Sequence, residues 1–185
     1  MGNRNHPAIG LRTFADFPAG TKVLLLQLHG SLTYWHDRDR HVKLPRDGLG
    51  DLGVWGAVRS RTTDLRPSVV LANHRDKARH VDQPPFKLAY SQFKKSLESS
   101  DRWLIVGYSF RDQPINQMIS NVFLGKKEKP RVLVATYGNE LTAEDIERTL
   151  GWGEEDPDSA EWLSICRTGA NGLEETEEWR SFVGD

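Results

Sequence analysis

Apolar runs and helix-period segments alternate through the middle of the chain. Phe86, Tyr90, Phe93 and Leu97 recur at helical spacing, which predicts a helix that packs through one apolar face. The short uncharged run Trp103–Val106 follows, and its length and β-branched pair predict a strand buried on both faces. This region is therefore expected to begin with a helix that is followed by a strand.

The polar residues after this strand predict a tight loop and a helix start. Gly107 ends the apolar run, and Ser109 and Asp112 are residue types that cap helices. Pro114 suits a first helical turn, and apolar residues at helical spacing continue over 115–122. In an open α/β sheet such a loop lies at the carboxyl edge, where backbone N–H groups bind phosphates. An ordinary strand-to-helix connection is the alternative.

The C-terminal third continues the alternation. Strands are expected over 131–136 and 162–166, a helix is expected after the N-cap Thr142 with Asp145 at its third position, and a last helix over 174–183. This order predicts an α/β fold with a doubly wound, mostly parallel Rossmann-like sheet. The sheet is expected to be incomplete at its N-terminal side, because no Gly-x-Gly-x-x-Gly or P-loop motif occurs.

The N-terminal part predicts further strands. The apolar run Thr21–Leu28 reads as a buried strand that ends at His29, and a histidine there could serve as a base or be held in a turn. Residues 32–35 and 41–44 predict a hairpin, and 45–67 predicts a long excursion with a short helix near 53–58. A strand is also expected over 68–71. His36, Asp37, Asp39 and His41 surround the hairpin turn, but no further ligand accompanies them, so no metal site is assigned.

Length and charge set the broad class. The 185 residues, 37% hydrophobic and 28% charged, predict a single α/β domain over 1–185. Residues 1–139 hold 22 Lys and Arg against 12 Asp and Glu, whereas the acidic C-terminal segment 140–185 holds 3 against 14. The basic part could attract phosphate-bearing ligands, and the acidic segment could simply pack beside it. No apolar run is long enough to cross a membrane and no signal peptide is evident, so a cytoplasmic protein without a membrane partner is expected.

Three blocks together resemble the sirtuin family, specifically its bacterial zinc-free branch of NAD-hydrolysing defence proteins. The first block is Leu28–Leu32 with Tyr34-Trp35, and the second is Arg66–Val70 followed by a polar loop. The third block is Trp103–Asp112 ending in Ile115-Asn116. Their order and separation carry the resemblance, which covers about residues 21–136.

The resemblance implies both a reaction and a site. NAD is the implied substrate, and the implied reaction is hydrolysis of the bond between nicotinamide and ribose, in anti-phage defence. His29 corresponds to the family's catalytic base. Five residues are implied to bind the dinucleotide: Gly30, Gly107, Ser109, Asp112 and Asn116. Of these, Gly107 and Ser109 are implied to lie at the ribose and phosphates. Asp112 and Asn116 are implied to hold the loop or the ribose.

The chain also departs from the family pattern. Sirtuins bind zinc through four cysteines, whereas Cys166 is the single cysteine here, so no zinc and no deacylase activity are expected. The family's Gly-Ala-Gly-x-Ser loop and Asn-Tyr-Asp or Gln-Asn-x-Asp motif do not precede His29. The chain is therefore expected to be the C-terminal part of such a domain. Two partners are candidates: another chain that supplies the missing half, and a second copy of this chain. A non-catalytic interaction or nucleic-acid-binding module is the alternative function.

Overall fold

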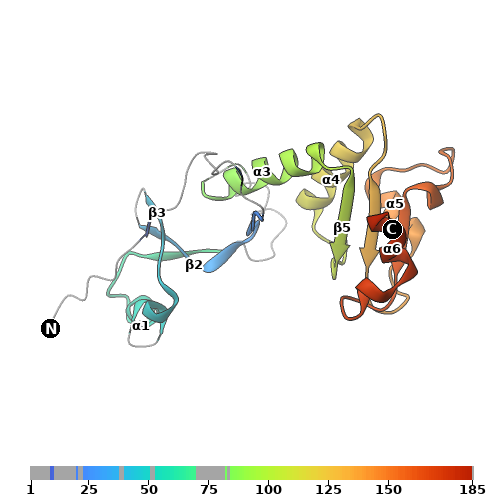
Figure 1. Ribbon diagram of the computed structural model, residues 1–185. Coiled ribbons are helices and arrows are strands. Elements are labelled where there is room, and N and C mark those ends of the chain that lie inside the picture. The colour runs from blue at the N-terminus through green and yellow to red at the C-terminus, as the bar shows by residue number, and fades with distance from the viewer. Residues whose placement is uncertain are drawn as a thin grey trace. The chain divides into compact units, whose positions relative to one another are not determined.

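The computed structural model divides the chain into two compact units, Met1–Phe93 and Lys94–Asp185, and each is described by itself (Figure 1). The structure describes residues 9–10, 20, 23–37, 40–50, 53–69, 82 and 84–184.

The first unit is built on an antiparallel sheet with the strand order β1-β3-β2-β4. Its strands are β1 (Ile9–Gly10), β2 (Gly30–Asp37), β3 (Arg40–Lys43) and β4 (Arg66–Val69). Strands β2 and β3 form the hairpin that the sequence predicts, whereas the strand expected over 68–71 is placed slightly earlier and pairs with β2.

The excursion between β3 and β4 forms the core of this unit. It contains a short 3₁₀ helix, η1 (Arg46–Leu49), and the expected short helix, α1 (Val54–Arg59). Trp35 is fully buried among Leu44, Leu49 and Val54, and its ring meets Trp55 edge-on at 4.9 Å between centroids. Aromatic packing of this kind explains why so polar a stretch folds onto the sheet.

The strand expected over Thr21–Leu28 is not present between residues 23 and 27. Val23 and Leu25 are 82% and 83% exposed, and none of the described strands pairs with this segment. An apolar run specifies a buried strand only where a neighbouring strand supplies hydrogen bonds and a face to cover it. The prediction from hydrophobicity alone was therefore wrong for these residues.

The second unit has the α/β architecture that the sequence predicts. A wholly parallel sheet with the order β5-β6-β7 alternates with helices in a Rossmann-like arrangement. In chain order, after the helix that contains the boundary between the units, the elements are α3 (Phe86–Ser99), β5 (Arg102–Val106), α4 (Gln113–Gly125), β6 (Arg131–Ala135), α5 (Ala143–Leu150), η2 (Ser159–Glu161), β7 (Leu163–Cys166), η3 (Leu173–Glu175) and α6 (Glu177–Val183).

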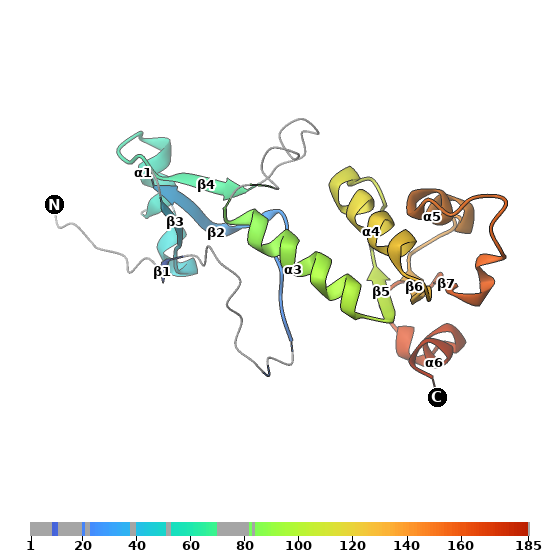
Figure 2. The ribbon, with the colours of Figure 1, turned by 90° about the horizontal axis from the view of Figure 1, so that it is seen from above.

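Helices cover both faces of this parallel sheet, with α4 and α5 on one side and α6 on the other (Figure 2). On the first side, the fully buried ring of Phe123 contacts Trp103, Trp152 and Trp162 at centroid distances of 6.1, 5.8 and 4.6 Å. On the other side, an apolar cluster joins the sheet to the last two helices, and its members are Leu133, Ala135, Cys166, Leu173, Trp179 and Phe182. The strand β6 between these layers is the centre of the core.

Strand β5 is an edge of the sheet. Leu104 and Val106 lie beside Leu133 and Ala135 on the same face, but they are 42% and 45% exposed. Side chains of the described residues therefore leave the β5 end of this apolar face partly uncovered.

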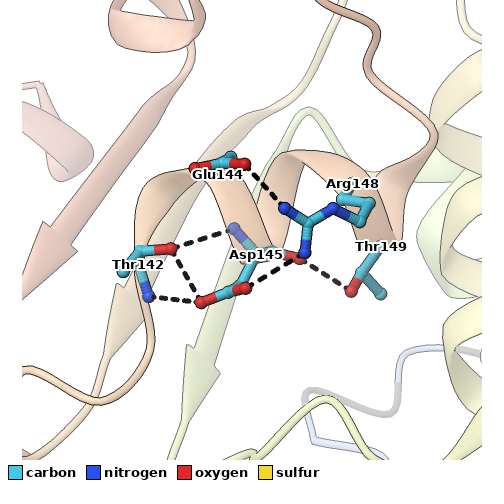
Figure 3. Close-up of polar contacts among 5 residues, drawn as sticks. All are labelled: Thr142, Glu144, Asp145, Arg148 and Thr149. Atoms are coloured by element: carbon cyan, nitrogen blue, oxygen red, sulfur yellow. Dashed lines mark hydrogen bonds and ion pairs between the residues drawn. The ribbon is translucent and has the colours of Figure 1, made fainter.

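Helix α5 begins with the capping box that the sequence predicts (Figure 3). The Asp145 backbone N–H donates to the Thr142 hydroxyl at 3.1 Å, and the Thr142 backbone N–H donates to the Asp145 carboxylate at 3.1 Å. Arg148 bridges Asp145 and Glu144 from the next turn. Hydrogen bonds from the Thr142 side chain and backbone, and then the charge of Arg148, lower the pKa of Asp145 below its usual 3.8.

Candidate functional site

Gly107 opens the loop at the carboxyl end of β5. Its φ is +62°, and its N–H donates to the carbonyl of Ala135 on β6 at 3.0 Å. A β-carbon at this position would meet no atom of the described structure within 4 Å. The turn therefore needs glycine for its backbone conformation, and the space beside it is open, as expected of a strand end that a ligand approaches.

Asp112 caps the helix that follows, as the sequence predicts. Its carboxylate accepts a long hydrogen bond, 3.5 Å, from the N–H of Ile115, and Pro114 lies in the first turn of α4. Asp112 is buried. The N-terminus of α4 thus already faces a carboxylate of its own chain.

Asn116 holds the same loop from the second turn of α4. Its side-chain nitrogen donates to the carbonyl of Phe110 at 2.6 Å, and its side-chain oxygen accepts from the Tyr108 hydroxyl at 2.6 Å. Phe110 is buried with a φ of +54°, and its ring lies 4.9 Å from that of Tyr108. Sequence reasoning missed Tyr108 and Phe110, because an interaction between residues eight apart across a strand-to-helix turn has no periodic signature.

Polar and aromatic groups gather at the carboxyl ends of the three parallel strands. Ser109 is exposed on the loop after β5, and Tyr137, two residues after the end of β6, is 86% exposed. Gly138 has a φ of +74° with open space beside it, and Arg167 after β7 donates to the Gly138 carbonyl at 3.2 Å. This edge offers a hydroxyl, an aromatic ring and open space beside two glycines, which suits a sugar-phosphate ligand.

His29 and Gly30 lie in the first unit. His29 occupies a turn directly before β2, and the turn is closed by a hydrogen bond of 3.0 Å from Gly30 N–H to the carbonyl of Gln27. Gly30 has a φ of +84°, and a β-carbon there would lie 2.3 Å from the carbonyl oxygen of Ser68 on β4. The sequence predicts His29 at the end of a buried strand, whereas in the structure His29 precedes β2 of an antiparallel sheet.

The structure thus brings Gly107, Ser109, Asp112 and Asn116 together on one loop and helix of the second unit. His29 and Gly30 are neighbours in the first unit. That all six residues serve a single site stays a prediction.

The two histidines of the hairpin are cross-strand neighbours. His36 pairs with His41 in the register of β2 and β3, with ring centroids 5.0 Å apart. Burial, followed by the proximity of His36, lowers the pKa of His41 below its usual 6.5. Asp39 lies outside the described residues, and the part of the chain that the structure describes contains no group of three or more side chains suited to a metal ion.

A parallel sheet with helices on both faces and an open glycine turn at its carboxyl edge defines a Rossmann-like α/β protein. The chain belongs to the SIR2-like domain family, whose family model matches residues 12–156. The sirtuin-like resemblance of the sequence is thereby confirmed at the level of the family, which indicates an NAD-related function. No curated protein and no solved structure matches the chain. Within the described residues, no helix has the length and apolar character that a membrane span requires.

Proposed function

We propose that the chain is the NAD-binding part of a sirtuin-like NAD⁺ hydrolase, which cleaves the bond between nicotinamide and ribose. The observation that carries the proposal is the SIR2-like match over residues 12–156, which includes the open turn at Gly107. In this reaction water replaces nicotinamide on the ribose, and the products are ADP-ribose, nicotinamide and a proton. On the same resemblance we propose a role in anti-phage defence.

The proposed roles follow the chemistry of each residue. His29 is the base that acts on the nicotinamide ribose, since histidine is the side chain most often used for proton transfer near neutral pH. The ribose and phosphates bind in the open space beside Gly107 and at the hydroxyl of Ser109. Asp112 and Asn116 hold the loop that carries them. Gly30 lies next to the base and sets the turn.

Binding is the first test of the proposal, because it requires no turnover. Calorimetric titration of the full chain with ADP-ribose should show saturable binding, and Ser109→Ala should weaken it about fivefold to tenfold, as expected for loss of a hydrogen bond. Failure of the unaltered chain to bind ADP-ribose at millimolar concentration would refute the proposed function.

Turnover is the second test. We propose that hydrolysis needs a partner chain that supplies the Gly-Ala-Gly-x-Ser and Asn-Tyr-Asp motifs. In a longer protein that contains this chain and both motifs, nicotinamide release should fall at least about a hundredfold in His29→Ala, the usual scale for loss of an acid–base group. His36→Ala is the matched control, because it removes a second histidine of the same unit. Equal nicotinamide release by His29→Ala and the unaltered protein would remove His29 from the mechanism. Infection of cells that carry either histidine variant should show loss of NAD only where His29 is intact.

A further inference from the structure

Phe110 has a backbone conformation that a residue with a side chain rarely adopts. Its φ of +54° lies in the left-handed region, where the β-carbon approaches the following carbonyl oxygen. Such a conformation persists only where surrounding contacts fix it, and it occurs preferentially at functional sites. Phe110 is also the last apolar residue before the N-cap of α4, so its conformation sets the direction in which the loop enters α4.

Hydrogen bonds of the Asn116 side chain on α4, together with the Tyr108 hydroxyl, restrain that conformation. The Asn116 side-chain nitrogen binds the Phe110 carbonyl at 2.6 Å, and the Tyr108 hydroxyl donates to the Asn116 oxygen at 2.6 Å, with the carbonyl of Asp112 a second acceptor at 3.2 Å. Both polar ends of the Asn116 side chain are therefore used inside the loop. Contact between the Tyr108 and Phe110 rings adds a third restraint.

Ser109 lies between the two restrained aromatic residues and differs from them in exposure. Tyr108 is partly buried and Phe110 is buried, whereas Ser109 is exposed and its hydroxyl makes no hydrogen bond to the described residues. Gly107, on its other side, faces open space. The restraints on Tyr108 and Phe110 thus determine where the hydroxyl of Ser109 and the backbone at Gly107 point.

We propose that Tyr108 and Asn116 are positioning residues, which hold Phe110 in the left-handed conformation and so present Gly107 and Ser109 to the sugar-phosphate part of NAD. This inference rests on the proposed function, because it concerns the same loop. It assigns Asn116 to the loop and adds Tyr108, which no motif indicates.

The loop itself is tested by amide hydrogen exchange on the full chain. Tyr108→Phe removes only the hydroxyl, and Asn116→Ala removes the amide. Both should speed the exchange of amides in 108–111 by about fivefold or more, as expected for loss of a hydrogen bond, and leave β6 unchanged. Asn121→Ala is the matched control, because it removes an exposed asparagine side chain from the same helix, α4. Unchanged exchange in both test variants would overturn the inference.

Positioning is tested by ligand binding in the same three variants. Titration with ADP-ribose should show affinity about fivefold to tenfold weaker in Tyr108→Phe and Asn116→Ala, at temperatures where both remain folded, and unchanged affinity in Asn121→Ala. A looser loop with unchanged affinity would overturn the positioning role and leave the proposed function intact. If the unaltered chain bound no ADP-ribose, the proposed function would fail, and the positioning role with it.

Discussion

Gly30→Ala tests two reasons for a glycine beside the proposed base, which are the positive φ of its backbone and the close approach of β4. Gly30 has a φ of +84°, so any side chain there is strained by about 1–2 kcal/mol. The added β-carbon would also lie 2.3 Å from the Ser68 carbonyl oxygen, whereas carbon–oxygen contacts of this kind normally begin near about 3.3 Å. Strand β4 would have to move away by about 1 Å, at the place where its Val69 pairs with Gly30 of β2.

Gly107→Ala is the matched control, because it carries the strain without the clash. Its φ is +62°, and a β-carbon there meets nothing within 4 Å. Strain of about 1–2 kcal/mol, offset by about 0.4–1 kcal/mol of lost chain entropy in the unfolded state, leaves a net cost of about 1 kcal/mol. Gly30→Ala should cost about 3 kcal/mol or more, because backbone must move as well.

Urea unfolding followed by hydrogen exchange of peptides from each unit measures both costs separately. For units of about a hundred residues, total stability is about 5–15 kcal/mol, so Gly30→Ala should remove a large share from the first unit alone. Gly107→Ala should lower the melting temperature of the second unit by about 4–8 °C. If Gly30→Ala proved no more costly than Gly107→Ala, the close approach of β2 and β4 at Gly30 would not limit the fold.

Two further predictions concern the charged and titrating groups. Thr142→Ala should destabilise the second unit by about 1 kcal/mol through loss of the N-cap, with Thr142→Ser as control, measured by urea unfolding. The same substitution should raise the pKa of Asp145, measured by carboxyl NMR titration. In the unaltered protein the folded state lowers this pKa, so the stability that Asp145 contributes is present above pH 3.8 and is lost as the pH falls through the folded pKa. The pKa of His41 is lowered as well, so the unfolded state binds its proton first, and stability should decrease as the pH falls from 6.5 toward the folded pKa. His41→Gln should flatten that dependence in unfolding measured at pH 7.5 and 5.5, and an unchanged slope would contradict the assignment.

The second unit could be predicted from the sequence because its signals are local. Helical periodicity located α3, the residue types Asp112 and Thr142 located two helix starts, and a short apolar run located β5. Each of these features depends on residues within a few positions of one another. Parallel pairing then follows from the alternation of strands and helices, which admits few other arrangements.

The first unit could not be predicted to the same extent, because its strand pairing, apart from the β2–β3 hairpin, is not local. The run Val23–Gln27 has the composition of a buried strand, yet burial depends on a partner that the run itself does not specify. Strand β4 joins β2 across the whole excursion that contains α1, and no residue pattern encodes that choice. Likewise, the hydrogen bond from Tyr108 to Asn116 depends on how sharply the chain turns between them.

Geometry also divides the residues assigned to the dinucleotide by what requires them. Gly30 is required by the backbone of Ser68 whether or not a ligand binds, and Asp112 and Asn116 are engaged with their own loop. Gly107 is required by its positive φ, although the space beside it is open. Ser109 differs, because it is exposed and its hydroxyl makes no hydrogen bond to the described residues. Changes at the first four should therefore be visible in the ligand-free protein, whereas Ser109→Ala should be silent until ADP-ribose is added. A ligand at this strand edge would explain why a serine occupies that exposed position.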